Sequence, residues 1–326
     1  MTRLLLPAFV LALCAVAGNA IAQDKLRVKV FPGAQNLAHY VGQSKGVFAK
    51  HGVAVELLFT VNSDELRGEL GEGKIDIAHA AVDNALAMIE VAKKDVAIVI
   101  GGDSSMNEFF VQADIASLAE LRGKTLIVDA PNTAYALLAK KILKNAGLKE
   151  GDYVVKPVGG TMLRLKAMTE NKEYAAAILN APFSFAARRA GMKSMGRAVD
   201  LLGPYQASGA FVMRPWASAH AGTLERYLAA YVESTRFARD PANRDDCIKL
   251  LAERLKLEPQ VAVQTYEALM DPAFGLAPDA RINPEGFRNV LALRAEIEGQ
   301  WGGTPPAPDK YLELGYYERA LKLLNR

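Results

Sequence analysis

Residues 71–86 combine a short apolar strand, a polar turn and the start of a helix. Ile75 and Ile77 alternate with polar or small neighbours, and Asp83 or Asn84 can cap the helix that follows. The same order of strand, turn and helix recurs over the first two thirds of the chain. Strands alternating with helices at this spacing predict mainly parallel sheets with helices on both sides. In such sheets the ligand crevice lies beside the carboxyl ends of the strands.

The alternating or continuous apolar segments predict nine strands. They fall at residues 25–31, 53–59, 75–78, 96–100, 109–111, 125–128, 153–158, 175–179 and 209–213. Polar turns follow most of these strands, and apolar residues at helical spacing follow the turns. We expect the strands at 109–111 and 209–213 to carry the chain out of a first lobe and back into it. Beyond Pro215 the spacing predicts helices to the end of the chain.

Residues 1–22 have the layout of a secretory signal peptide. Arg3 precedes an apolar run from Leu4 to Ala17, and small residues precede Gln23. No later stretch offers about 18 consecutive apolar residues, so we expect an exported, periplasmic protein without a membrane span. Cys14 raises the alternative of a lipid anchor, but a leucine stands where lipid transfer needs a small residue, and we do not expect lipid anchoring.

The remainder of the 326-residue chain exceeds the usual size of one hydrophobic core, which predicts two lobes. We expect residues 23–112 and 208–326 to form a discontinuous lobe 1, and residues 113–207 to form lobe 2. The formal net charge of +3 is spread along the chain and does not favour nucleic-acid binding. Cys247 is the only cysteine outside the leader, so no internal disulfide is expected.

Motifs for catalysis and metal binding do not assemble. Residues 68–74 have the spacing of a phosphate-binding loop, but Ile75 replaces the required Ser or Thr and the loop follows a helix instead of a strand. The histidines show no metal-ligand spacing, and Cys247 has no nearby histidine to activate it. We therefore expect no metal, no cofactor and no enzymatic activity.

Four segments carry a resemblance to a known family. Residues 39–56 resemble the first helix and second strand of the substrate-binding proteins of nitrate, sulfonate and taurine ABC importers, which are related to thiamine-precursor synthases. Residues 71–78, 118–125 and 152–161 are similar to later family signatures, in the same order. The resemblance spans residues 25–215. It implies a two-lobed periplasmic binding protein of type II, with a mixed, mainly parallel sheet flanked by helices in each lobe and a helical C-terminal tail.

The resemblance also implies a function. Such a protein encloses a small polar ligand between its lobes and delivers it to an ABC permease and the ATPase of that permease. We expect a monomer that contacts the membrane only through the permease. Two alternatives remain: an enzyme on the same fold, of the thiamine-precursor synthase or menaquinone-pathway dehydratase type, and a receptor that feeds a sensor.

The resemblance places ligand-lining residues in the turns after the strands. They are Ala34, Gln35, Asn36, Asn62, Ser63, Ala80, Ala81, Asp83, Asn84, Asn132, Thr133, Gly160, Thr161, Asn180 and Pro182. Side-chain amides, hydroxyls and helix-start N–H groups would hydrogen-bond a buried polar ligand. The alternative for Asn62, Asn132, Thr133 and Thr161 is that they only cap helices.

Asp83 bears on the charge of the ligand. Helix starts favour an anion, but the turns hold no arginine or lysine, and a carboxylate would repel a purely anionic ligand. We therefore expect a ligand that is neutral or carries an amine or heterocyclic N–H that Asp83 accepts. The alternative is that Asp83 caps its helix. His79 and Tyr135 are expected to pack in the core rather than to contact the ligand.

Overall fold

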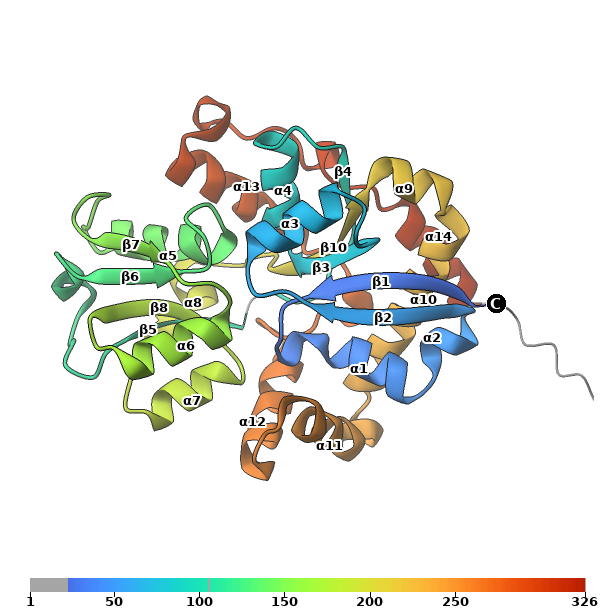
Figure 1. The fold of residues 1–326 in the computed structure, drawn as a ribbon, viewed down its shortest axis with the longest axis horizontal. Helices are drawn as coiled ribbons and strands as arrows, with labels where there is room; N and C mark the ends of the chain where they lie inside the picture. Colours follow the sequence, from blue (N-terminus) through green and yellow to red (C-terminus); the bar gives the residue numbers. More distant parts are fainter. Residues whose placement is uncertain (1–22, 105, 326) are drawn as a thin grey trace, which may run out of the picture.

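Two five-stranded sheets form the centres of two lobes in the part of the chain that the structure describes, residues 23–104 and 106–325 of a computed structural model (Figure 1). The expected signal peptide and Cys14 lie outside the described residues. The first sheet has the order β2 (Val53–Phe59), β1 (Asp24–Val30), β3 (Ile77–Ala81), β10 (Ser208–Met213) and β4 (Val96–Ile100). The second has the order β7 (Val154–Pro157), β6 (Thr125–Val128), β8 (Tyr174–Asn180), β5 (Asn107–Val111) and β9 (Lys193–Arg197).

The two sheets share one topology. In each, one strand is antiparallel to both of its neighbours, β10 in the first sheet and β5 in the second, and the other strands run in one direction. These are the segments expected to carry the chain between the lobes. Each sheet is thus mixed and mainly parallel, and the expected fold class is confirmed.

The sheet to which β5 belongs changes the proposed division of the chain. We expected lobe 1 to extend to residue 112, but β5 pairs with β8 and β9 in the second sheet. The chain therefore leaves the first sheet after Ile100 and enters the second at Asn107, and we now propose the first boundary between these two residues. It returns through β10, which begins at residue 208, where we expected lobe 1 to resume.

Helices cover both faces of the two sheets (Figure 1). The first ten are α1 (Leu37–Ser44), α2 (Val47–Lys50), α3 (Ser63–Gly71), α4 (Asp83–Glu90), α5 (Ala134–Asn145), α6 (Thr161–Glu170), α7 (Phe183–Arg189), α8 (Ala198–Leu202), α9 (Arg214–Ala219) and α10 (Ala221–Arg239). The last four are α11 (Arg244–Leu255), α12 (Pro259–Met270), α13 (Pro284–Glu298) and α14 (Gly315–Leu324). Short 3₁₀ turns lie at Ala34–Asn36, Leu118–Leu121, Pro241–Asn243, Pro278–Ala280, Gln300–Gly303 and Pro308–Lys310.

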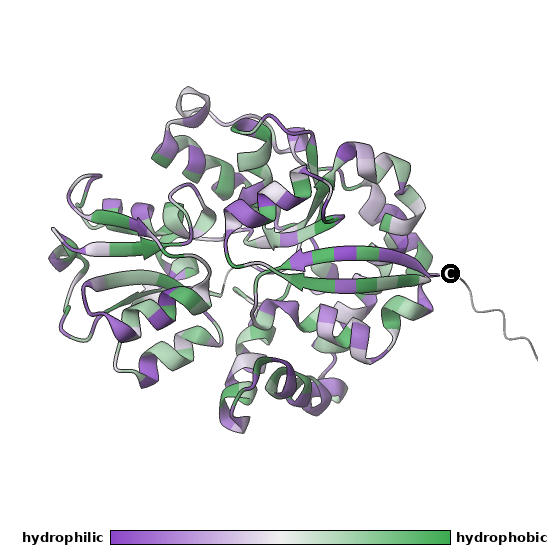
Figure 2. Ribbon diagram, viewed as in Figure 1, coloured by the Kyte–Doolittle hydropathy of each residue, from purple (hydrophilic) through white to green (hydrophobic). Residues whose placement is uncertain are grey.

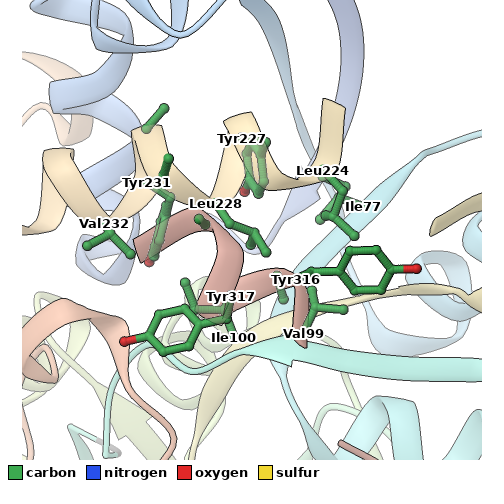
Figure 3. Close-up of a cluster of buried hydrophobic side chains, with 14 of the residues drawn as sticks. Ile77, Val99, Ile100, Leu224, Tyr227, Leu228, Tyr231, Val232, Tyr316 and Tyr317 are labelled. Atoms are coloured by element: carbon green, nitrogen blue, oxygen red, sulfur yellow. The ribbon is translucent and has the colours of Figure 1, made fainter. Parts of the chain in front are cut away.

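The strand patterns follow from which faces are covered. All five residues of β4 are buried, as a strand covered on both faces requires, and β1 alternates between hydrophilic and hydrophobic residues (Figure 2). Helices α10 and α14 pack on one face of the first sheet, where Tyr227, Leu228 and Tyr317 belong to the same buried cluster as Ile100 (Figure 3). The C-terminal helices therefore complete the core of the first lobe. Helix α13 adds Phe287, Val290 and Leu291 to a second core cluster of the first lobe, and it also packs against α5 of the second lobe.

Two further observations concern single elements. Cys247 is buried in α11. Within the described residues, the search for a helix that is both long and apolar enough to cross a bilayer finds none.

Gly209 allows close approach of β10 to its neighbours. A Cβ at this position would lie 2.5 Å from the Ile100 carbonyl oxygen and 2.8 Å from Val82 Cγ1. We expect Gly209→Ala to lower the free energy of unfolding by about 1–3 kcal/mol, because the backbone must shift to relieve the overlap. Urea unfolding checks this. The control is Gly68→Ala in α3, because a Cβ there meets no atom within 4 Å and Ala favours the helix. Equal changes in the free energy of unfolding for the two variants would contradict the expectation.

Candidate ligand-binding site

A cavity lies between the two lobes at the ends of the strands. Its lining is Phe31, Pro32, Gln35, Ser63, Ala80, Ala81, Asn84, Asp103, Met106, Asn107, Asp129, Thr133, Ala134, Tyr135, Gly160, Thr161, Arg164, Asn180, Ala207 and Ser208. The space that the centre of a water molecule can occupy is about 50 Å³, which is room for a few waters or one small solute. Both lobes and both crossing segments contribute to this lining.

The structure places many of the predicted site residues in this lining. They are Gln35, Ser63, Ala80, Ala81, Asn84, Thr133, Gly160, Thr161 and Asn180. They follow the ends of different strands, so the topology brings together side chains that lie far apart in the sequence. Ala80 and Ala81 differ from the expectation only in that they end β3 instead of forming a turn. A role in ligand binding remains a prediction for each of these residues.

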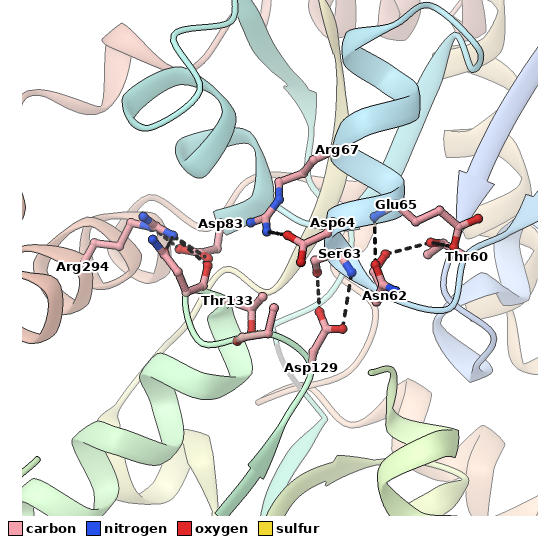
Figure 4. A network of polar contacts seen from close by, with 12 residues as sticks. Thr60, Asn62, Ser63, Asp64, Glu65, Arg67, Asp83, Asp129, Thr133 and Arg294 are labelled. Atoms are coloured by element: carbon pink, nitrogen blue, oxygen red, sulfur yellow. Dashed lines mark hydrogen bonds and ion pairs between the residues drawn. The ribbon is translucent and has the colours of Figure 1, made fainter. Parts of the chain in front are cut away.

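The other predicted residues lie outside the lining, and several are used by the protein itself. Ala34 is buried in the core that α1 and α11 share. Asn36 donates from Nδ2 to the Phe31 carbonyl oxygen at 2.7 Å. Asn62 caps α3, because its Oδ1 accepts the Glu65 N–H at 2.8 Å (Figure 4). Pro182 precedes α7.

Asp83 and Asn132 belong to a buried ion-pair cluster. Arg294 of α13 donates from Nε to Asp83 Oδ1 at 2.5 Å and from Nη2 to Asp83 Oδ2 at 3.1 Å (Figure 4). The same guanidinium donates to the side chain of Asn132 and to Gln300 Oε1 at 3.0 Å. The expectation that Asp83 accepts an N–H of the ligand is therefore wrong, because both of its oxygens face Arg294 instead of the cavity.

Burial and pairing act in opposite directions on this arginine. Burial lowers the pKa of Arg294, but the Asp83 carboxylate outweighs it and raises the pKa above its usual value. Arg294 was missed because nothing in its helical context marks it as different from Arg288, the exposed arginine of the same helix.

Two carboxylates in the lining were also missed by the sequence analysis. Asp129 directly follows β6, and Asp103 lies three residues after β4. Each is the first charged residue after its strand, so the strand-end rule that selected the other turns could have found both. Tyr135 was expected to pack, and it does lie half-buried beside Arg164 with the guanidinium carbon 5.3 Å from its ring centroid, but it also lines the cavity.

Asp129 connects the two lobes. Its Oδ1 accepts the backbone N–H of Ser63 at 3.3 Å, and its Oδ2 accepts the Ser63 hydroxyl (Figure 4). Ser63 is the first residue of α3, so the carboxylate lies at a helix N-terminus, where free N–H groups and the helix dipole favour negative charge. The bond therefore holds lobe 2 against lobe 1 at the cavity wall.

Arg164 also lines the cavity and is fully buried. Its Nη1 donates to the Gly159 carbonyl oxygen at 2.6 Å, and its Nε and Nη2 donate to the Ile178 carbonyl oxygen at 3.3 and 3.1 Å. Nη2 also donates to Thr161 Oγ1 at 3.1 Å. Burial lowers the pKa of Arg164, and the charge of Asp129 acts against this effect. This arginine therefore ties together the backbone turns of lobe 2.

Several buried amide atoms at the cavity have no hydrogen-bond partner among the described residues. They are Gln35 Oε1, Asn84 Oδ1, Asn107 Oδ1 and Asn107 Nδ2. Asn107 lies near enough to the Tyr135 hydroxyl to affect its pKa, but neither amide atom reaches hydrogen-bonding geometry with the protein. Buried polar groups in native proteins are nearly always paired, so these atoms point to a bound solute or to ordered water.

The described residues contain no cluster of three or more His, Cys, Asp or Glu side chains arranged to hold a metal ion. The chemistry available in the cavity is hydrogen bonding and charge pairing.

The fold is that of the periplasmic binding proteins. Residues 34–243 match the family described as "NMT1/THI5 like". The chain belongs to this family, and the resemblance found in the sequence is confirmed. A search of curated proteins finds no match.

Solved structures with the same fold include three ligand-binding proteins. The ligand-binding component of an ABC-type import system from Staphylococcus aureus has a TM-score of 0.76 and 18% identity, over 91% of this chain and 99% of that one. The nitrate-binding protein NrtA from Synechocystis PCC 6803 has a TM-score of 0.75 and 13% identity, over 93% and 89%. The alkanesulfonate-binding protein SsuA from Xanthomonas axonopodis pv. citri has a TM-score of 0.70 and 15% identity, over 86% and 94%.

Proposed function

We propose that this protein is a periplasmic solute-binding protein that captures a small polar organic ligand between its lobes and delivers it to an ABC importer. The observation that carries the proposal is the cavity between the lobes, into which both lobes bring polar side chains and where buried amide atoms lack partners. Membership of the family and the similarity to binding components of import systems support it. The partners are then a permease and its ATPase.

Closure of the two lobes is the motion that the geometry supports. The lobes are joined by the segments that lead into β5 and β10, and hinge closure around such segments encloses a ligand. Ser63 and Asp129 meet across the cavity in the closed form. Lys141 of α5 also pairs with Glu296 of α13 at 2.6 Å, which joins the outer edges of the lobes. We propose that the protein acts as a monomer, exported by the leader at residues 1–22.

Binding without chemical turnover fits the lining. Within the described residues the cavity wall contains no histidine, lysine or cysteine, so Ser63 and Ser208 each face a carboxylate without an imidazole to relay a proton. A hydrolytic or transfer reaction has no activated nucleophile there. We therefore propose no enzymatic activity.

The direct test is to denature the purified protein and identify any released small molecule by mass spectrometry. The proposal expects one compound in near-stoichiometric amount, or, for protein purified empty, a ligand that shifts small-angle scattering toward a more compact shape. Protein that releases nothing and that no solute from a periplasmic extract compacts would contradict the proposal.

Ser63→Ala tests the closed form. The variant loses the hydroxyl that donates to Asp129, and we expect ligand affinity to fall by about 1.5–3 kcal/mol, the usual value of a hydrogen bond to a charged group. Calorimetry with the released compound measures this loss. The matched control is Ser218→Ala on the exposed side of α9, which should keep the affinity of the parent protein. Unchanged affinity of Ser63→Ala would remove this contact from the mechanism.

A further inference from the structure

We propose that the solute is a small organic cation, an amine or amidine rich in N–H donors, and that Asp129 is the residue that selects it. This inference rests on the proposed binding function and specifies the class of ligand. It starts from the observation that a carboxylate of the protein itself occupies an anion-binding position at the cavity.

The N-terminus of α3 is one of the anion positions at the cavity. A helix start offers free N–H groups to a negatively charged ligand. In this chain the Asp129 carboxylate occupies that place, because it accepts both the backbone N–H and the hydroxyl of Ser63. A sulfonate or carboxylate entering the cavity would meet a negative charge that already holds these donors.

Three of the hydroxyl donors in the lining are also used. Thr133 Oγ1 donates to the Ala130 carbonyl oxygen at 2.9 Å, and the Ser208 hydroxyl donates to Asp103 Oδ2. With Ser63, three hydroxyl groups of the lining therefore point their hydrogens at protein acceptors. An incoming acceptor, such as a sulfonate oxygen, would have to break a bond to use any of these three donors.

The unpartnered atoms are mainly acceptors. Gln35 donates from Nε2 to the Phe31 carbonyl oxygen, and Asn84 donates from Nδ2 to the Ala81 carbonyl oxygen, each at 3.2 Å. The amide oxygens of both residues have no hydrogen-bond partner among the described residues. Asn107 adds one more oxygen and one NH2 group, which carries two N–H donors. Asn84 and Asn107 are 98% and 99% buried. A ligand that supplies N–H groups therefore removes the free-energy cost of leaving their buried oxygens without hydrogen bonds.

The charges of the lining favour the same class of ligand as the unpartnered acceptor atoms. Asp103 and Asp129 contribute two carboxylates, and Arg164 contributes one guanidinium whose N–H groups bind lobe 2 carbonyl oxygens and Thr161. No lysine or second arginine lines the cavity within residues 23–104 and 106–325. The lining thus holds more carboxylates than guanidinium groups, which favours a cationic ligand over an anionic one. Phe31 and Met106 give this ligand an apolar side to cover.

The test compares two series of equal chain length: methyl- to butylammonium, and methane- to butanesulfonate. Each is titrated into the ligand-free protein by calorimetry at low ionic strength, and thermal unfolding is followed at 10 mM. We expect at least one ammonium ion to bind and to raise the melting temperature, and no sulfonate to do so. The variant Asp129→Asn should weaken ammonium binding by about tenfold to a hundredfold, the effect of losing a charge-assisted hydrogen bond.

Asp309→Asn is the matched control, since Asp309 is exposed on the first lobe and should leave both series unchanged. Urea unfolding of Asp129→Asn verifies that it folds, and Asp103→Asn repeats the measurement at the second carboxylate. Tighter binding of a sulfonate than of its matched ammonium ion would overturn the ligand class and leave the binding function intact. If neither series binds and the denatured protein releases no small molecule, both the inference and the proposed function fail.

Discussion

Replacing Arg294 with methionine is expected to lower the free energy of unfolding by about 3–5 kcal/mol, the cost of leaving a buried charge without its partner. Arg294 is 0% exposed and Asp83 is 1% exposed, so no water can compensate the carboxylate once the guanidinium is gone. The variant also removes the bonds to Asn132 and Gln300. Urea unfolding at pH 7, followed by far-ultraviolet circular dichroism, measures the change.

Two variants make this result interpretable. Arg288→Met changes an exposed arginine of the same helix and should alter the free energy of unfolding by no more than about 0.5 kcal/mol. Adding Asp83→Asn to Arg294→Met removes the unpaired charge and should restore part of the lost stability. An Arg294→Met variant as stable as Arg288→Met would show that the pair contributes nothing to the fold.

The architecture could be predicted because it depends on local patterns. Alternation in β1, the continuous apolar run of β4 and the turns after each strand are properties of neighbouring residues, and periodicity records them. Sheet membership is different, since β5 has the same apolar composition whichever lobe it joins. Its pairing with β8 is a contact over a long sequence separation, and no pattern within residues 107–111 specifies it.

The same difference between local patterns and long-range contacts explains which residues of the site could be predicted. Ser63, Thr133 and Thr161 were found because a strand's carboxyl end and a helix start mark them in the sequence. Asp83 has those marks too, yet it lies outside the lining, because its oxygens meet an arginine that is 211 positions further along the chain. Whether a turn carboxylate faces a ligand or a buried cation is decided by such remote partners, and the sequence of the turn does not contain them.

Lowering the pH from 6.5 to 4.5 is expected to cost the protein about 2 kcal/mol of stability through His79 alone. His79 is buried among the rings of His39 and Tyr231, with centroids at 4.9 and 4.5 Å, and neither of its nitrogens has a partner in the described part of the chain. Burial lowers the pKa of His79 to about 3. The unfolded chain therefore takes up a proton near pH 6.5 while the folded chain does not.

The direction of the effect follows from this difference in protonation. The contribution of His79 is complete above pH 6.5, declines as the pH falls toward 3, and does not change further below that value. Burial, and then the charge of His79, also lowers the pKa of His39 well below its usual value, so His39 adds a loss of the same sign. Stability should thus rise with pH between 3 and 6.5 more steeply than carboxylate titration alone produces.

His79→Leu separates this effect from the titration of carboxylates. Leucine fills the buried site without polar atoms, so we expect stability at pH 7 to be retained and the loss between pH 6.5 and 4.5 to shrink by about 2 kcal/mol. Urea unfolding at both pH values measures the difference. His220→Ala, at an exposed histidine, should keep the steep pH dependence of the parent protein. If His79→Leu and the parent protein lose the same stability in acid, the buried imidazole is not what makes the fold acid-sensitive. Carboxylates that are paired in the folded state, such as Glu65 with Lys29, must then account for the loss. Pairing with Lys29 lowers the pKa of Glu65, and protonation of Glu65 removes the pair.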